Sequence, residues 1–372
     1  MQNLGIAQSR HEEELPVPTS RAPFVSIVMP ALNEERYIAD AIASLLPRSE
    51  ALDYELLVLD GGSRDRTREI VKALAEQHTQ IRLLHNDRRI QSAALNIASE
   101  VCDPRAEILV RADCHAQYPA NFAARCADTL IRTASASVVV PMRAVGRQPL
   151  QRAIAAAQNS RLGNGGSQHR IAGLSGYVEH GHHAAFDRAV FRALGGYDET
   201  APYNEDAEFD TRLIASGKRI YLDGALTIDY FPRSSLRALA RQYFRHGWGR
   251  ANTLLKHAKL PKLRQLLPVL TLMLAVAGLA LWPFAGLAAL VPTLGYAAAC
   301  LLWGAVLAGQ SRDLAVLLAG PAAITMHMSW ACGFLVRVAE ERLPGLVRRV
   351  RSLSARLHGT RGAPKRDAGH KA

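Results

Sequence analysis

Short apolar runs alternate with amphipathic stretches along the first part of the chain. Five runs rich in branched aliphatic residues end at polar or turn residues, as buried strands do; they are 25–29, 56–59, 81–84, 108–110 and 138–140. Helical apolar periods follow the first three, opening with Asn33 as an N-cap and recurring at about 67–75 and 91–98. This alternation predicts an α/β fold with a parallel, doubly wound sheet.

The pattern changes near residue 234. Residues 234–257 have the period of an amphipathic helix, with an arginine at every fourth position: Arg237, Arg241 and Arg245. Two arrangements suit such a helix: it lies on an anionic membrane surface, or it packs on the preceding domain as its last helix.

Three apolar segments follow this helix, at 266–282, 284–308 and 314–336. No charged residue occurs from 266 to 310, and about twenty apolar residues suffice to span a bilayer. We therefore predict a C-terminal α-helical membrane region, with a tight hairpin at Pro283.

Basic residues lie on both sides of this apolar region. The chain has a net charge of +12, and lysines and arginines cluster in this way beside anionic membrane lipid. The positive-inside rule places both Lys259 to Arg264 and the ten Lys and Arg after Val336 in the cytoplasm. Three full crossings cannot satisfy both placements, so one segment is expected to be re-entrant or interfacial. The sequence lacks an aromatic-interleaved basic module, which argues against nucleic acid as a partner.

Polar side chains follow three of the predicted strands. Asn33, Asp60 and Asp113 each come just after a strand, and the carboxyl ends of parallel strands meet at one ligand-binding crevice. Further along, four carboxylates occupy six positions from Glu205 to Asp210. Crowded carboxylates repel one another, so at least one is expected to have a raised pKa and to accept a proton near neutral pH.

The order of these motifs resembles that of the family-2 glycosyltransferases. The similarity is carried by 25–35 (VSIVMPALNEE), by 58–67 (VLDGGSRDRT), and by Asn204-Glu205-Asp206 after the turn Gly195 to Glu199. It covers roughly residues 23–250. Within the family, 111–115, 242–248 and the apolar segments are most similar to succinoglycan-type exopolysaccharide glucosyltransferases.

The resemblance implies a GT-A-type domain, which binds a nucleotide-diphospho-sugar, with UDP-glucose as the expected donor. Asp60 is expected to read the base, Arg89 and Gln91 to reach the diphosphate, and further donor contacts to come from Pro30, Ala31, Asn33, Glu34 and Asp113. The residues leave other interpretations open: Asp60 also suits the turn before Gly61-Gly62, and Arg88 and Arg89 also suit a solvated basic loop.

A divalent cation, Mn²⁺ or Mg²⁺, is the expected cofactor, with Asp113 and His115 as its protein ligands. The family pattern at this point is usually Asp-x-Asp, whereas this chain has Asp113-Cys114-His115. Histidine is a softer ligand that suits Mn²⁺ better than Mg²⁺. The alternative for His115 is a polar wall residue that never touches metal.

Asp206 is expected to be the general base, removing a proton from the acceptor hydroxyl in a single displacement. One carboxylate suffices where metal stabilises the leaving group, so the reaction would invert an α-linked donor into a β-linked product. Glu205 would raise the pKa of Asp206 or orient the acceptor. Glu208 and Asp210 are interpreted as ordinary helix-start acids suited to the helix dipole.

Acceptor contacts are expected in two places. His180 and His182 belong to the segment 179–183 (EHGHH), which would line the acceptor site; zinc binding and core hydrogen bonding are the alternatives. Gln242, Arg245 and Trp248 resemble, in looser spacing, the QxxRW-like element with which membrane-embedded polysaccharide synthases hold the acceptor sugar. The alternative is a face of a membrane-surface helix.

Together these features predict an inverting glycosyltransferase of the bacterial inner membrane, multi-pass, with a cytoplasmic catalytic domain and a lipid-linked saccharide as acceptor. Other exopolysaccharide assembly proteins are a further class of partner. The alternatives are a polyprenyl-phosphate sugar synthase and a catalytically silent assembly protein. The expected parts are a flexible leader (1–22), the catalytic domain (23–235), a basic juxtamembrane helix (236–265), transmembrane segments (266–336) and a basic cytoplasmic tail (337–372).

Overall fold

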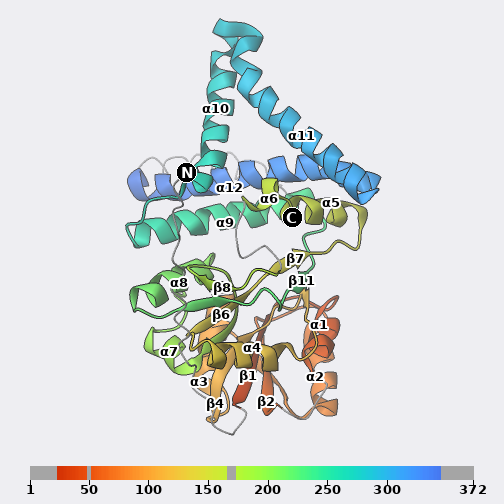
Figure 1. The fold of residues 1–372 in the computed structure, drawn as a ribbon, viewed down its shortest axis with the longest axis vertical. Helices are drawn as coiled ribbons and strands as arrows, with labels where there is room; N and C mark the ends of the chain where they lie inside the picture. The colour runs from red at the N-terminus through yellow and green to blue at the C-terminus, as the bar shows by residue number, and fades with distance from the viewer. Residues whose placement is uncertain (1–22, 48–51, 166–172, 345–372) are drawn as a thin grey trace, which may run out of the picture.

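A computed structural model of the protein describes residues 23–47, 52–165 and 173–344. The predicted leader, and the tail beyond residue 344, lie outside the described residues. An eight-stranded mixed sheet forms the centre of the domain at the bottom of Figure 1, with strand order β3-β2-β1-β4-β9-β6-β10-β8. Its parallel half comprises β1 (Phe24–Ala31), β2 (Tyr54–Asp60), β3 (Ile81–His85) and β4 (Ala106–Arg111). The other half comprises β9 (His182–Asp187), β6 (Ser137–Val140), β10 (Ile220–Leu222) and β8 (Gly176–Val178).

The five predicted strands all lie within observed ones, and the α/β fold is confirmed. Their apolar residues are buried because helices cover both faces of the sheet. One face packs against α1 (Ile38–Leu45), α2 (Thr67–Gln77) and α4 (Phe122–Arg132). The other packs against α3 (Gln91–Val101), α7 (Arg188–Ala193) and α8 (Glu205–Ala215).

Two details differ from the sequence prediction. The sheet is not wholly parallel, because β9 lies antiparallel between β4 and β6. This strand was not predicted, because it begins with two histidines and has only a short apolar run after them. Helix α1 begins at Ile38 rather than after Asn33. Asn33 adopts a left-handed backbone conformation (φ 58°) and contacts the turn after β2, where its backbone N–H donates to Ser63 Oγ at 2.8 Å.

A pair of helices lies above the sheet domain in Figure 1: α9 (Leu236–Lys256) and α12 (Ala319–Arg342) run side by side. Their backbones touch at two glycines. A Cβ on Gly247 would lie 1.9 Å from the Trp330 carbonyl oxygen, and one on Gly333 would lie 2.0 Å from that of Phe244. These two helices, called the helix plate below, also contact α5 (Pro149–Asn159) and α6 (Arg161–Asn164).

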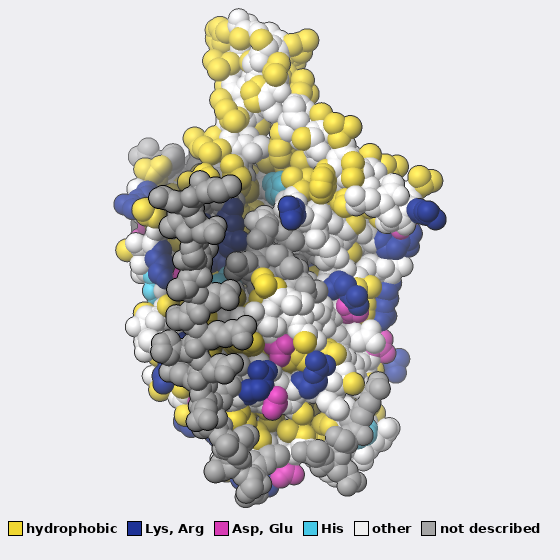
Figure 2. All heavy atoms as spheres, viewed as in Figure 1, with side chains coloured by type: hydrophobic (Ala, Val, Ile, Leu, Met, Phe, Trp, Pro, Cys, Tyr) yellow, Lys and Arg dark blue, Asp and Glu magenta, His cyan; other side chains and the backbone are white. Residues whose placement is uncertain are grey.

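A helical hairpin projects away from the plate (Figure 1): α10 (Leu263–Ala285), the 3₁₀ turn η2 (Gly286–Leu290) and α11 (Val291–Ser311). The turn therefore begins after Pro283, which lies inside α10. Apolar side chains cover the projection (Figure 2), and Phe284 near its tip is 87% exposed. By length and composition, 263–311 and 314–342 are both candidate membrane spans.

Helix α12 is tied to the remainder of the molecule rather than projecting from it. His327 on α12 has Nε2 at 2.9 Å from the Leu162 carbonyl oxygen and Nδ1 at 2.8 Å from the Tyr296 hydroxyl of α11. Just before α12, Asp313 accepts a 2.6 Å hydrogen bond from Arg152 of α5. The short helix η3 (Leu314–Leu318) connects this point to α12. A small second sheet, in the order β5 (Ala116–Gln117), β11 (Ile228–Tyr230) and β7 (Met142–Ala144), lies between the two parts.

Candidate active site

The predicted donor-side residues meet at the carboxyl ends of β1 and β2. Ala31 pairs with Asp60 in the parallel register, and its carbonyl accepts a hydrogen bond from Gly61 at 2.8 Å. Asp60 is 1% exposed, and its carboxylate accepts from the amides of Gly62 (3.0 Å) and Ser63 (3.2 Å). Asp60 therefore orders the turn, as one of its two sequence interpretations has it, and its contact with the base stays a prediction.

The segment before α3 reaches this same edge of the sheet. The guanidinium of Arg89 lies over the glycine turn, since a Cβ on Gly62 would be 3.6 Å from its Nη2. The Gln91 side chain donates to Asp113 Oδ1 at 2.8 Å. Arg88 instead forms an ion pair with Glu199. Arg89 and Gln91 thus lie at the predicted crevice, while Arg88 is engaged elsewhere.

A buried arginine at the end of β4 organises the acidic residues. The Arg111 side chain is 5% exposed and forms an ion pair and hydrogen bond with Asp206 Oδ1. It also lies 3.5 Å from Glu205 Oε1 and 3.6 Å from Asp113 Oδ1. One cation therefore faces three carboxylates, one from the segment just after β4 and two from the first turn of α8. Sequence reasoning did not assign a role to Arg111, although a charged residue that ends an apolar strand two positions before Asp113 was a usable signal.

The two adjacent carboxyls of α8 have opposite electrostatic surroundings. Burial, reinforced by the Asp206 carboxylate, raises the pKa of Glu205 to about 7. Burial also acts to raise the pKa of Asp206, but Arg111 and His183 outweigh it and hold that pKa well below its usual range. The cluster thus has one carboxyl with a raised pKa, as predicted, but it is Glu205 rather than Asp206.

The histidines of the EHGHH segment diverge rather than converge. His182 points to the carboxylates, with Nε2 3.6 Å from Asp113 Oδ2 and Nδ1 3.8 Å from Asp206 Oδ2. His183 is fully buried and lies 2.7 Å from the Tyr197 hydroxyl and 2.6 Å from Asp210 Oδ1. His180 lies 2.5 Å from Asp210 Oδ2. The three rings share no metal centre, so the zinc alternative has no geometric support.

Burial lowers the pKa of His182 to about 4, although the Asp113 carboxylate opposes this. Burial would likewise lower the pKa of His183, but Asp210 and Asp206 outweigh it and raise the pKa to about 9. At neutral pH His182 is therefore neutral and His183 is a cation. The Tyr197 hydroxyl, 3.0 Å from Asp206 Oδ1, connects His183 to the acidic cluster.

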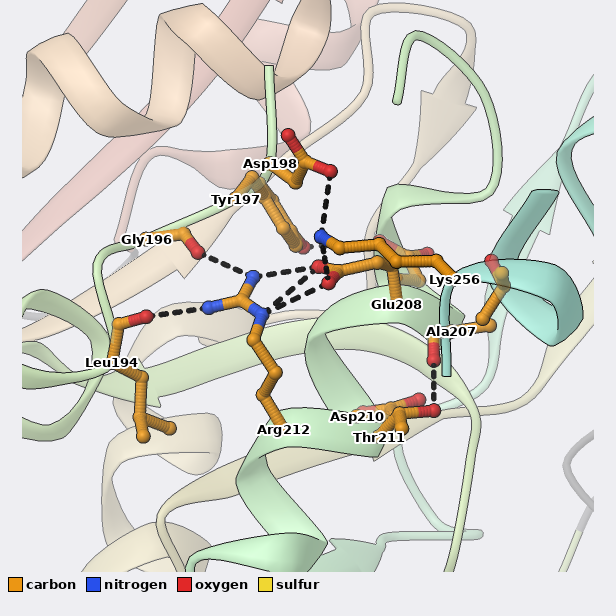
Figure 3. Close-up of polar contacts among 12 residues, drawn as sticks. Leu194, Gly196, Tyr197, Asp198, Ala207, Glu208, Asp210, Thr211, Arg212 and Lys256 are labelled. Carbon is orange, nitrogen blue, oxygen red and sulfur yellow. Dashed lines mark hydrogen bonds and ion pairs between the residues drawn. The ribbon is translucent and has the colours of Figure 1, made fainter. Parts of the chain in front are cut away.

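The interpretation of Asp210 and Glu208 as ordinary helix-start acids is wrong. Asp210 is buried between His180 and His183. Glu208 is fully buried and binds Arg212 at 2.7 Å and Lys256 at 2.6 Å (Figure 3). Arg212 in turn donates to the carbonyls of Leu194 and Gly196, so Glu208 fastens α8 to the preceding turn and to α9. Both carboxylates pair with residues from other segments of the chain, which a helix-dipole argument does not predict.

The donor set beside Asp113 fits a divalent cation held by few protein ligands. The Asp113 pKa is lowered: burial would raise it, but Arg111 outweighs burial, so the carboxylate is ionised. His182 is neutral and within reach, and Nδ1 of His115 is buried without a hydrogen-bond partner, 3.7 Å from Glu34 Oε1. Among the described residues, no group of three or more His, Cys, Asp or Glu could hold a metal ion. This suits a cation whose remaining ligands are phosphate and water oxygens.

The predicted acceptor residues on α9 fall into two groups. Gln242 donates to the Tyr230 hydroxyl at 2.9 Å, and the Tyr230 ring packs edge-on against His115. Arg245 and Trp248 instead line a hollow of about 280 Å³ with Tyr203, three residues before Asp206. Residues 242 and 245 are neighbours on the helix surface, but their side chains contact different groups, so the structure does not bring the three predicted residues to one place.

Comparison with known proteins agrees with this geometry. The family model described as glycosyl transferase family 2 matches residues 26–195. The succinoglycan biosynthesis protein ExoA of Rhizobium meliloti is 42% identical over 308 residues, which covers 83% of this chain and 93% of that protein. A dolichyl N-acetyl-alpha-D-glucosaminyl phosphate 3-beta-D-2,3-diacetamido-2,3-dideoxy-beta-D-glucuronosyltransferase of Methanococcus voltae is 24% identical, over 60% of this chain and 72% of that protein.

A solved structure has the same fold. The mannosyltransferase PcManGT of Pyrobaculum calidifontis, solved with GDP-Man and Mn²⁺, superposes with a TM-score of 0.53 at 21% identity. The superposition covers 89% of this chain and 92% of that one. With the strand-end crevice, the acidic first turn of α8 and the extent of the sequence match taken together, the chain belongs to glycosyl transferase family 2.

Proposed function

We propose that this protein is a membrane-anchored, metal-dependent, inverting glycosyltransferase of exopolysaccharide synthesis. It moves a sugar, with UDP-glucose as the expected donor, to a lipid-linked saccharide and forms a β-glycosidic bond. The observation that carries the proposal is the junction of Asp113, Arg111 and Asp206 at the carboxyl edge of the sheet. The similarity to a succinoglycan biosynthesis protein and to an enzyme named for a dolichyl-phosphate-linked substrate supports the same pathway class and acceptor class.

The donor lies across the ends of β1, β2 and β4. The base sits beside the Asp60 turn, against the wall that runs from Pro30 to Glu34, and the diphosphate extends toward Arg89 and Gln91. Asp113 holds the cation, with His115 or His182 as a second protein ligand. When bound, the divalent ion neutralises the diphosphate and so stabilises the leaving group. Gln91 orients the Asp113 carboxylate through their 2.8 Å hydrogen bond.

Asp206 is the general base. Its Oδ1 is fixed by Arg111 and by the Tyr197 hydroxyl, which leaves Oδ2 to accept the proton of the acceptor hydroxyl. Because its pKa is low, the carboxylate is ionised at neutral pH and available as an acceptor. The carboxylate attracts the hydroxyl proton as the oxygen attacks the anomeric carbon from the face opposite the leaving diphosphate, and the configuration inverts. Glu205 orients the acceptor beside it.

The apolar hairpin enters the bilayer and anchors the enzyme. Helix α10 has 23 residues, or about 34 Å at 1.5 Å each, against a hydrocarbon core of about 30 Å. Both ends of the hairpin return to the helix plate (Figure 1), and α12 stays at the surface, held by its glycine contacts to α9. The basic residues before α10, Lys259 and Lys262, and those in the last turns of α12, Arg337 and Arg342, are then on the same side, as the positive-inside rule requires. That side is the cytosol, where nucleotide sugars are made.

Transfer by the purified protein tests this function. With a lipid extract and Mn²⁺ or Mg²⁺, a screen of nucleotide sugars is expected to give UDP release and a labelled oligosaccharide-lipid. Asp206→Asn should lower transfer by roughly 10²–10⁴-fold, the range for general bases. The variant should still fold and bind membranes, but at a lower unfolding temperature, because Arg111 loses its carboxylate partner. Asp128→Asn on the exposed side of α4 is the matched control.

Three outcomes would contradict the proposal. Near wild-type transfer by Asp206→Asn would exclude Asp206 as the base. Label found only in a monosaccharide-lipid would indicate a polyprenyl-phosphate sugar synthase instead. No release of a nucleoside diphosphate from any nucleotide sugar with either metal would indicate a catalytically silent assembly protein.

A further inference from the structure

The hollow beside Tyr203 is built by three separate parts of the chain. One face of α9 contributes residues at helical spacing, α12 contributes two residues and the turn before α8 contributes Tyr203; the lining residues are Tyr203, Arg241, Phe244, Arg245, Trp248, Val336 and Glu340. We refer to it as the plate hollow. Its position is fixed by the glycine contacts between α9 and α12, because both of its helical walls belong to that plate.

The plate hollow carries unbalanced positive charge. Within the described residues, no ion pair joins Arg241 or Arg245 to a carboxylate. Both arginines are exposed at the edge of the hollow, and the Arg245 guanidinium lies 5.1 Å from the centre of the Tyr203 ring. The single lining carboxylate, Glu340, accepts a 2.9 Å hydrogen bond from Trp248 Nε1. Two guanidinium groups against one engaged carboxylate favour an anionic ligand.

The aromatic rings make the hollow suit a particular kind of anion. Arginine forks bind the oxygens of a phosphate in pairs, and rings that flank them supply a surface for an apolar or sugar moiety beside the phosphate. Trp248 contacts Tyr203 in a T-shaped arrangement, with ring centroids 6.1 Å apart, and Arg337, whose guanidinium lies 5.4 Å from the Trp248 ring centre. These contacts position Trp248 in the wall of the hollow.

The plate hollow lies between the apolar hairpin and the acidic cluster of the candidate active site. Tyr203 lies three residues before Asp206, and Gly249 of α9 packs so closely on Tyr203 that an added Cβ would lie 2.6 Å from its carbonyl oxygen. On the other side, the plate is the base from which the apolar hairpin rises (Figure 1). A group bound here lies between the bilayer and the general base.

We infer that the plate hollow binds the phosphate of a polyprenyl-linked acceptor. This inference rests on the proposed function and deepens it: the phosphate is held by Arg241 and Arg245, and the sugar it carries reaches toward Asp206. Trp248 and Phe244 line the path of the first isoprene units. General attraction of α9 to an anionic membrane would be a different effect. In that case every exposed arginine of the helix would contribute equally to membrane binding.

Equilibrium binding to vesicles tests the inference without any transfer reaction. Wild-type protein is compared on phosphatidylcholine vesicles that contain either a polyprenyl phosphate or phosphatidylglycerol at equal charge. We expect at least tenfold tighter binding to the polyprenyl phosphate, and we expect Arg241→Gln with Arg245→Gln to abolish that preference. The matched control is Arg237→Gln, an exposed arginine one turn earlier on α9 that does not line the hollow.

Two results would overturn the inference. Equal wild-type binding to the two kinds of vesicle would mean that the arginines sense surface charge only. A loss of preference in Arg237→Gln as large as in the double variant would lead to the same conclusion. Because no donor is present, this failure is distinguishable from failure of the proposed function, which UDP release reports separately.

Discussion

Replacing Arg111 with methionine removes the one cation that faces Asp113, Glu205 and Asp206. The methionine fills much of the same volume, so the main change is electrostatic. The side chain is 5% exposed, and loss of one partner from a buried ion pair costs about 3–5 kcal/mol. For a domain of this size that corresponds to a fall in unfolding temperature on the order of 10 °C.

The sign of the pH dependence follows from Asp206. A carboxyl whose pKa is depressed in the folded protein contributes stability above its unfolded pKa, and that contribution is lost as the pH falls through the folded value. Arg111→Met removes the part of this contribution that comes from Arg111, and His183 remains beside the carboxylate. Its deficit relative to the wild type should therefore be full at neutral pH and shrink as the pH falls below about 4.

Thermal unfolding in detergent, followed at neutral and acidic pH, measures both effects. Arg143→Met is the control, because Arg143 pairs with Asp229 at 2.7 Å on the surface and is 63% exposed. Such a pair is worth less than about 1 kcal/mol. A loss at neutral pH no greater than that of Arg143→Met would refute the reasoning, as would a deficit that stays constant with pH.

Three further predictions concern the plate, the pH profile and the metal. Gly247→Ala should lower the free energy of unfolding by about 1–3 kcal/mol, because the added Cβ would lie 1.9 Å from the Trp330 carbonyl oxygen. Gly309→Ala is the control, since its added Cβ would have no atom within 4 Å. Equal unfolding temperatures for the two variants would contradict this prediction. The wild-type pH profile of kcat/KM should contain a step near pH 7 from Glu205 that Glu205→Gln lacks, and an unchanged profile would assign the step elsewhere. Chelation by EDTA should abolish transfer, and His115→Ala should raise the Mn²⁺ concentration needed for half-maximal transfer; an unchanged requirement would make His115 a wall residue.

The strands and their order along the chain were predictable because each is a short apolar run that ends at a polar residue. The carboxyl ends of parallel strands also lie at one edge of the sheet, so the sequence alone predicts that Asp60 and Asp113 lie at the same crevice. The hairpin was predictable from the uncharged stretch and its proline. Its turn lies beyond that proline, because Pro283 is tolerated near the end of α10 while Gly286 adopts the positive φ that ends the helix.

The electrostatic assignment within the acidic cluster was not predictable. Neighbours in sequence, Glu205 and Asp206 differ in pKa because only Asp206 lies against both Arg111 and His183, which come from β4 and β9. The pairing of Asp210 was not predictable either. Its histidine partners lie on and just before β9, an antiparallel strand that was not predicted from the sequence.

The sequence by itself determined the fold class, the family and the set of residues available at the strand ends, because these depend on local periodicity and on motif order. Only the tertiary structure decided how the charges pair, which faces of α9 are available and that α12 packs on α9 at two glycines. Those outcomes depend on contacts between segments far apart in the chain, where a few ångströms decide whether a carboxylate meets an arginine or another carboxylate.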